Sequence, residues 1–212
     1  MVMFLKPADL EVGEVKPFDS FPLALQEGSL SGFIFTDGLA ETVFTHHLIA
    51  SALERGPVYH LGPGGLLSIG HLRKMVDDLS NLYAGNVYSV DELISALEGV
   101  EKGSLVIVSR FPALPGRSGE GLVEIRRIVD KKGLILVLSH FTFDLNELDL
   151  SGEFARLYDL PELFETLAVL RASSYRGHHR LNLTILRAPA EYVAAVGDHS
   201  IPADSLVRPF LG

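Results

Sequence analysis

Short apolar segments alternate with helix-like segments over most of the chain, and this alternation constrains the fold more than any other feature. Residues 105–109 and 133–139 are continuous apolar runs, which is typical of strands whose two faces are both covered. Residues 120–131, between these two runs, have the pattern of a helix. Parallel strands need such crossover connections. The sequence therefore predicts an α/β fold in which a mostly parallel central sheet lies between two helical layers.

The other segments continue the same pattern. We expect further strands at residues 30–35, 57–61 and 86–89, and further helices at residues 43–53, 68–83 and 90–97. Residues 141–165 have the composition of loops. Residues 166–172 and 180–187 predict a C-terminal β-hairpin joined around residues 175–179, because apolar and polar side chains alternate in the second of them.

Length and composition predict one main domain. The chain has 212 residues, 47% of them hydrophobic, which is enough to bury a sizeable core. We expect residues 1–28 to form an extended or short-helical lead-in and residues 29–190 to form the core domain. Residues 191–212 are expected to be a C-terminal tail, in which residues 197–212, with two prolines and no apolar period, are loosely held.

Charge and cysteine content limit the possible partners and compartment. The formal net charge of −9 repels polyanions, so nucleic-acid binding would need a strong local basic patch. The chain has no cysteine, which suits a reducing cytosol. No apolar run reaches the roughly 20 residues that a membrane-spanning helix needs. We therefore expect a soluble, cytoplasmic protein that does not associate with membranes.

The segment that follows the first strand has the position of a phosphate-binding loop. A strand at 30–35, a loop of eight residues and a helix at 43–53 together form the arrangement of a P-loop. When the consensus GxxxxGK[ST] is aligned with this arrangement, its two glycines fall on Phe35 and Ala40. Its lysine falls on Glu41 and its hydroxyl residue on Thr42. Only the hydroxyl is present.

The order of these elements resembles the ATPase core of the RecA superfamily, in particular its archaeal RadA, RadB and KaiC-like branch. The likeness extends over about residues 17–188. Residues 27–30 resemble the E-x-G-[ST]-[IL] lead into the first core strand, 59–64 are similar to Y-I-D-T-E-G, and 105–109 are similar to L-V-I-D-S. Residues 134–140 resemble the strand that ends in a polar sensor, and 166–186 resemble the terminal hairpin. The resemblance implies a three-layer RecA-like fold and a role in archaeal DNA recombination.

The resemblance fails where the family binds and hydrolyses ATP. Glycines and a lysine hold the phosphates of a P-loop, but here Glu41 would repel them. The metal-associated aspartate is replaced at Val108 and Ser109, and the water-activating glutamate falls on Pro63. We therefore expect no catalytic residue, no ATP or Mg²⁺ as cofactor, and a degenerate nucleotide site that comprises Phe35, Thr36, Asp37, Gly38, Leu39, Ala40, Glu41, Thr42, Pro63, Val108 and Ser109.

Two further patterns point to protein contacts. Phe21 and Ala24 fit the F-x-x-A pattern by which RecA-class recombinases hook a neighbouring subunit, although a phenylalanine that anchors the lead-in to its own core is the simpler interpretation. The second pattern is a basic hairpin, which could meet an anionic ligand or the acidic segment 141–165 of the same chain or of a neighbour. Ordinary edge-strand charge is the alternative. Its residues are Arg171, Arg176, His178, His179, Arg180 and Arg187.

Other sites are weakly indicated by the sequence. Arg110, Arg117, Arg126, Arg127, Lys131 and Lys132 form a second basic cluster, for which solvated helix charge is the simpler interpretation. His46 and His47 point about 100° apart on a helix, so we expect no shared metal ion. Ser139 and His140 are sequence neighbours, which rarely lets a nucleophile and its base share a hydrogen bond.

The sequence thus predicts a non-catalytic RecA-fold protein that acts by binding another protein, as an oligomer or as an accessory to a recombinase-type ATPase. Two alternatives stay open. The first is a nucleotide or small-molecule binding protein, or an enzyme, that uses the crevice between residues 36–42 and 109–111. The second is a protein that binds single-stranded nucleic acid through the basic hairpin, although the net negative charge of the chain opposes such binding.

Overall fold

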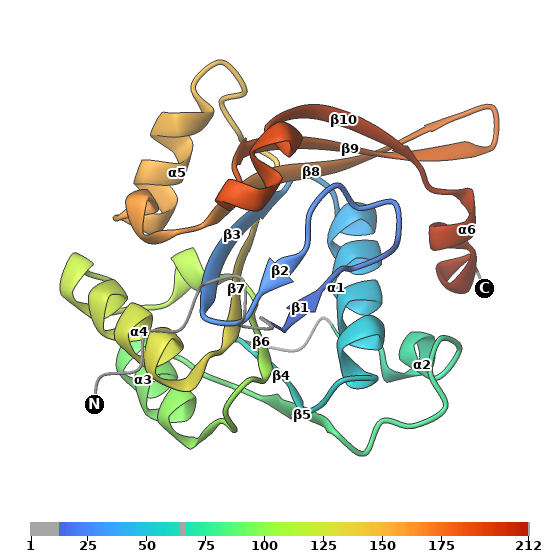
Figure 1. The fold of residues 1–212 in the computed structure, drawn as a ribbon. Coiled ribbons are helices and arrows are strands. Elements are labelled where there is room, and N and C mark those ends of the chain that lie inside the picture. The colour runs from blue at the N-terminus through green and yellow to red at the C-terminus, as the bar shows by residue number, and fades with distance from the viewer. Residues whose placement is uncertain (1–12, 64–66, 212) are drawn as a thin grey trace, which may run out of the picture.

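The computed structural model describes residues 13–63 and 67–211, and its centre is an eight-stranded sheet. The strand order is β10-β9-β8-β3-β7-β6-β4-β5. The central strand β3 (Ser29–Phe35) pairs in parallel with β7 (Ile135–Phe141) on one side and with β8 (Thr166–Tyr175) on the other. Strands β4 (Val58–Leu61), β5 (Leu82–Gly85) and β6 (Leu105–Val108) continue the parallel part, as Figure 1 shows.

Helices cover both faces of the sheet, so the molecule has three layers (Figure 1). Helices α1 (Gly38–Leu53), α2 (Ile69–Leu72) and α6 (Asp204–Val207) pack into one apolar core, and α3 (Val90–Gly99), α4 (Gly119–Lys132) and α5 (Leu150–Tyr158) pack into the other. Because β3 and β6 contribute to both cores, every residue of these two strands is buried. The predicted α/β fold with a mostly parallel sheet is confirmed.

The end of the sheet next to β8 is antiparallel. Strand β9 (His178–Arg187) forms a hairpin with β8, and β10 (Gly197–Pro202) pairs with β9. Arg176 and Gly177 alone connect β8 to β9, with φ of 51° and 81°. Positive φ at both central residues is the type I′ turn that suits the twist of a two-residue hairpin. The predicted hairpin is present, and its strands are longer than expected.

Residues 68–83 do not form the expected helix. Helix α2 ends at Leu72, and β5 begins at Leu82, so the expected strand at 86–89 lies four residues too late. Between them, the Asp78 carboxylate accepts hydrogen bonds from the backbone N–H and the hydroxyl of Ser80, at 2.8 and 3.0 Å. Such local bonds compete with helix formation, which explains why the apolar spacing was misleading.

Two expectations about the last third of the chain are also wrong. Residues 141–165 include helix α5, whose first turn is capped by the carboxylate of Asp149 at 2.9 Å from the N–H of Gly152. Residues 197–202 are not a loosely held tail, because they form β10 with Ile201 buried against the core. The N-terminal segment adds a small two-stranded sheet, β1 (Glu14–Val15) and β2 (Leu25–Gln26), and residues 1–12 of the expected lead-in lie outside the described part.

Short 3-10 helices complete the structure: η2 (Phe111–Ala113), η3 (Pro161–Leu163), η4 (Ala190–Ala195) and η5 (Arg208–Phe210). None of the helices in the described part of the chain combines the length and the apolar character needed to cross a membrane.

Candidate functional site

The connection from β3 to α1 is too short to be a phosphate-binding loop. Helix α1 begins at Gly38, so only Thr36 and Asp37 separate it from the strand, and the expected eight-residue loop is wrong. The Asp37 carboxylate caps the helix, since it accepts hydrogen bonds from the N–H of Ala40 at 2.8 Å and from the N–H of Ala172. A carboxylate of the chain itself therefore occupies the end of α1 where an anion would be favoured.

The residues of the degenerate nucleotide site lie in different environments. Phe35, Ala40 and Val108 are fully buried in the two cores. Leu39 is half-buried against the core that contains α1. Pro63 is half-buried at the edge of the described residues, and the glycines at 64 and 65 of the expected motif lie outside them. Most of these side chains support the fold and do not face a common ligand.

A small cavity lies where the nucleotide crevice was expected. Its volume is about 120 Å³, and it is enclosed between the first turns of α1 and the carboxyl ends of β4 and β6. It is lined by Gly38 and by six residues with polar side chains, which are Glu41, Thr42, Thr45, His46, His60 and Ser109. Ligands of parallel α/β sheets characteristically bind at this end of the strands.

His60 and Ser109 form a buried hydrogen-bonded pair in this cavity. The Ser109 hydroxyl lies 3.0 Å from Nε2 of His60, and the two residues are 5% and 4% exposed, respectively. The backbone of Ser109 is fixed because its N–H donates to the Leu61 carbonyl at 2.8 Å. Burial, with the nearby His46 as a smaller cause, lowers the pKa of His60 to about 4. The imidazole is therefore neutral at physiological pH.

The backbone turns sharply around this pair. Arg110, which follows Ser109, is in the left-handed region with φ of 57°, and the chain then enters η2. A Cβ on Gly62 would lie 2.9 Å from the Ser109 carbonyl oxygen, so the strand ends approach too closely for a side chain there. This close approach explains why residue 62 is a glycine. Ser109 directly follows the last residue of β6.

Glu41 and His46 enter the cavity from α1. Burial raises the pKa of Glu41, and the positive charge of Arg110 opposes this effect. The N–H of Ser68 donates to Nε2 of His46 at 3.2 Å, so Nδ1 carries the proton that is donated to the Thr42 carbonyl at 2.8 Å. Burial lowers the pKa of His46 as well. The cavity thus holds neutral imidazoles beside a carboxyl group.

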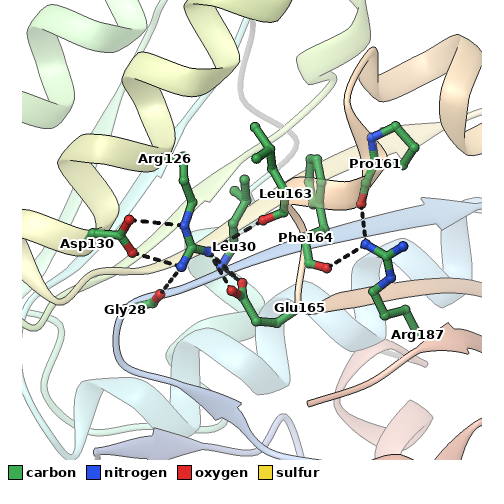
Figure 2. A network of polar contacts seen from close by, with 9 residues as sticks. All are labelled: Gly28, Leu30, Arg126, Asp130, Pro161, Leu163, Phe164, Glu165 and Arg187. Carbon is green, nitrogen blue, oxygen red and sulfur yellow. Dashed lines mark hydrogen bonds and ion pairs between the residues drawn. The ribbon is translucent and has the colours of Figure 1, made fainter. Parts of the chain in front are cut away.

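The basic hairpin is largely occupied by contacts within the chain. Arg171 pairs with Glu147 of the acidic segment at 2.9 Å, and the Arg187 guanidinium donates to the carbonyls of Pro161 and Phe164 (Figure 2). Arg180 contacts Ser200, and the side chain of His178 and the backbone N–H of His179 both contact Asp204. The turn is exposed, and there the Arg176 guanidinium lies 5.0 Å from the ring centre of the exposed Tyr175.

Arg126 of the second basic cluster belongs to an ion-pair network at the amino end of β3, next to the Arg187 contacts (Figure 2). Arg126 of α4 donates to both carboxylate oxygens of Glu165 at 2.7 Å, and it also contacts Asp130 and the Gly28 carbonyl. Glu165 in turn accepts from the N–H of Leu30 at 2.8 Å. Arg127 pairs with Glu124 on the surface of α4, Lys132 donates to two carbonyls, and Arg117 lies near Asp159. These contacts hold the fold together.

Phe21 and Ala24 are 1% and 0% exposed within the chain's own core. Phe21 packs against Phe18 and Phe44, with ring centres 5.4 and 5.6 Å apart. The described structure therefore corresponds to the anchoring alternative, and a hook to a neighbour would require both side chains to leave the core. Within residues 13–63 and 67–211, no group of three or more histidine, aspartate or glutamate side chains is arranged to hold a metal ion.

The loop from β7 to α5, residues 142–149, exposes large apolar side chains. Phe143 is 84% exposed and Leu148 is 99% exposed. Local hydrogen bonds order the backbone around them, from the Asp144 N–H to Thr142 at 3.1 Å and from the Leu148 N–H to Asn146 at 3.2 Å. Asp144, Glu147 and Asp149 give the same loop three acidic side chains. We call residues 142–149 the acidic loop.

The pairing of His60 with Ser109 was not predicted from the sequence. The sequence places Ser109 where an aspartate is expected, beside the candidate crevice, and His60 in a strand. A polar histidine inside the otherwise apolar segment 57–61 is the signal that could have drawn attention to it. Its partner lies 49 residues away, so only the sheet register brings them together.

No protein-family model matches this chain, and no curated protein matches it. The structural class of the protein is therefore assigned from its fold. It is a three-layer α/β protein with a mostly parallel sheet, an antiparallel hairpin at one edge and a small polar cavity at the carboxyl ends of two strands.

Proposed function

We propose that this chain is a RecA-like protein that does not hydrolyse ATP and that acts by binding another protein. The observation that carries the proposal is the acidic loop, which holds Phe143 and Leu148 in solvent on an ordered backbone. Exposed apolar side chains beside acidic ones are typical of a protein interface. The terminal hairpin at the edge of the parallel sheet supports the RecA-like assignment.

Two features argue against ATP hydrolysis in the manner of this superfamily. The two-residue connection and the Asp37 cap leave no loop to surround phosphates. The cavity of about 120 Å³ is also well below the 300 Å³ or more of ordinary small-molecule sites.

The partner that fits best is a second copy of the chain. The acidic loop carries negative charge, whereas the hairpin turn presents Tyr175 and the free cation of Arg176. A contact between the acidic loop of one copy and the hairpin turn of the next joins two different surfaces, so it builds a head-to-tail assembly. An ATPase-competent relative that offers a similar basic and aromatic turn would bind in the same way.

Light scattering at several salt concentrations tests this proposal. Oligomers are expected at low salt and should dissociate as salt screens the charges. The double variant Phe143→Ser with Leu148→Ser and the single variant Arg176→Glu should each be monomeric. Tyr88→Ser is the matched control, because Tyr88 is 60% exposed outside both surfaces and its loss should leave the assembly unchanged.

Calorimetric titration with ATP and Mg²⁺ tests the other half of the proposal. No heat of binding is expected. Micromolar binding, or ATP hydrolysis by purified protein, would overturn the assignment. A strictly monomeric protein at low salt and high concentration would exclude the self-assembly that we propose.

A further inference from the structure

The pair formed by His60 and Ser109 is unusual for its position as well as for its burial. Both residues lie at the carboxyl ends of neighbouring parallel strands, with Leu61 opposite Val108 in the register. Their hydrogen bond of 3.0 Å faces the cavity and not the apolar core, because both side chains line it. Stabilising a sheet does not require a histidine and a serine to face a shared polar space.

We propose that Ser109 is a nucleophile, that His60 is its general base, and that the cavity accepts a small uncharged acyl group from an ester. The inference is independent of the partner-binding proposal, because none of its residues belongs to the acidic loop or the hairpin turn.

The size and polarity of the cavity define the substrate. A volume of about 120 Å³ corresponds to roughly four water molecules at about 30 Å³ each. A short acyl chain such as acetyl fits this space, whereas a nucleotide or a long fatty acyl chain does not. Glu41 lines the same cavity and disfavours anionic substrates.

The reaction follows from the hydrogen bond between the pair. Oγ of Ser109 attacks the ester carbonyl carbon while its proton passes to Nε2 of His60, and the protonated His60 then gives that proton to the departing alcohol. Water, activated by the neutral His60, releases the acid from the acyl-serine and restores the hydroxyl. A positively charged His60 is thus formed transiently in the cavity that also contains Glu41, whose carboxylate would stabilise it.

The backbone supplies a second similarity to known serine sites. Strand β6 ends at Val108, and Ser109 is followed directly by the left-handed Arg110 and then by η2 and α4. A sharp turn between a strand and a helix is where α/β enzymes place a nucleophilic serine. The sequence around Ser109 lacks the G-x-S-x-G pattern, and the residue in the left-handed conformation is Arg110 and not the serine.

The low pKa of His60 predicts how the reaction depends on pH. With a value near 4, the imidazole is neutral and able to accept a proton at every pH above about 6. The rate should therefore rise with pH through about 4 and stay level above it. A serine that reacts without a base would instead react faster as the hydroxide concentration increases.

Methanesulfonyl fluoride is the probe for this site, since it is small and marks a nucleophilic serine by losing fluoride. Intact mass spectrometry should show one adduct, and peptide mapping should place it on Ser109. Ser109→Ala should give no adduct, and His60→Gln should slow labelling on the order of a hundredfold. Ser139→Ala is the matched control, because Ser139 is a buried serine on the neighbouring strand that donates only to the Val108 carbonyl.

Hydrolysis of 4-nitrophenyl acetate supplies a second measurement on the same variants. Wild-type protein should exceed Ser109→Ala, and its rate should be level between pH 6 and 8. The proposal is overturned if folded wild-type protein shows neither an adduct on Ser109 nor hydrolysis above Ser109→Ala. Equal labelling of wild type and folded His60→Gln would also overturn it, because His60 would then not act as the base.

Discussion

The two ends of the central sheet are built in opposite ways. At the amino end of β3, the Arg126 guanidinium, the Glu165 carboxylate and the backbone of residues 28–30 join three segments through charged hydrogen bonds (Figure 2). At the carboxyl end, neutral histidines, a serine and a buried carboxyl group surround an open space. At the amino end, charged side chains pair with one another, whereas at the carboxyl end several titratable side chains line a cavity.

This difference separates residues that maintain the fold from residues that could perform chemistry. Charged pairs with short bonds fix the positions of chain segments. A buried titratable group with a shifted pKa beside a cavity is characteristic of functional sites. The contrast predicts that substitutions at the amino end mainly lower stability, and that acid acts mainly on the carboxyl end.

Acidification should have the largest effect. The folded-state pKa of His60 is about 4, below the usual 6.5, so the unfolded chain binds a proton between these values that the folded chain does not. Stability is therefore complete above pH 6.5 and falls by about 3 kcal/mol as the pH drops to 4. His46, His47 and His140 act in the same direction, because burial lowers the pKa of each. Urea denaturation from pH 4 to 8 measures the loss, which should be smaller in His60→Gln.

Loss of Glu165 should have the next largest effect. Glu165→Ala leaves Arg126 without its bidentate partner and the Leu30 N–H without its acceptor. We expect a loss of about 2–3 kcal/mol, which is reduced from the cost at a fully buried pair because the Glu165 side chain is 33% exposed. Denaturation at pH 7 measures it. Glu124→Ala is the control, since its pair with Arg127 is more exposed and its loss should lower stability much less. Equal losses in both variants would contradict the role given to the network.

Removal of the α1 cap should have a moderate effect. Asp37→Ala removes the acceptor of the Ala40 N–H and also the bond to Ala172 of β8, so a loss of about 1–2 kcal/mol is expected. Ser118→Ala removes a comparable cap from α4, whose acceptor contacts only the Gly121 N–H, and should cost about 1 kcal/mol. Thermal denaturation of the two variants compares them. A smaller loss in Asp37→Ala would show that the bridge to β8 is not important.

Neutralisation of Glu41 should have the smallest effect and the opposite sign. Because burial raises the pKa of Glu41, the folded state resists the ionisation that occurs above pH 4.5 in the unfolded chain. Glu41→Gln should therefore increase stability at pH 7 by less than about 1 kcal/mol, with no gain below pH 4.5. A loss of stability at pH 7 would mean that the ionised carboxylate makes a favourable contact.

The fold was predictable from the sequence where apolar patterning and burial agree. Residues 105–108 and 135–138 are apolar throughout, and both segments lie in buried parallel strands. The prediction was wrong where hydrogen bonds of short polar side chains determine the backbone conformation, as in the Asp78 turn between α2 and β5. Strand β10 was missed because the residues that alternate there include Asp198, His199 and Ser200, and only pairing with β9 makes them a strand.

The candidate site was less predictable than the fold. Comparison with the P-loop consensus correctly predicted that residues 35–42 lie at the carboxyl end of β3. It could not show that α1 begins at Gly38. The contact of His60 with Ser109 depends on β4 and β6 being neighbours, which is a property of strand order. Local sequence patterns contain no information about which strands become neighbours.

The position of β3 at the centre of the sheet also affects how the protein is made on the ribosome. Residues 29–35 emerge early, yet their two partners in the sheet are residues 135–141 and 166–175. The apolar strand must therefore remain without its neighbours while more than 100 further residues are translated. Closure of such long chain segments slows folding and exposes aggregation-prone surface. A nascent chain of this protein is consequently a natural client for chaperones that bind extended apolar segments.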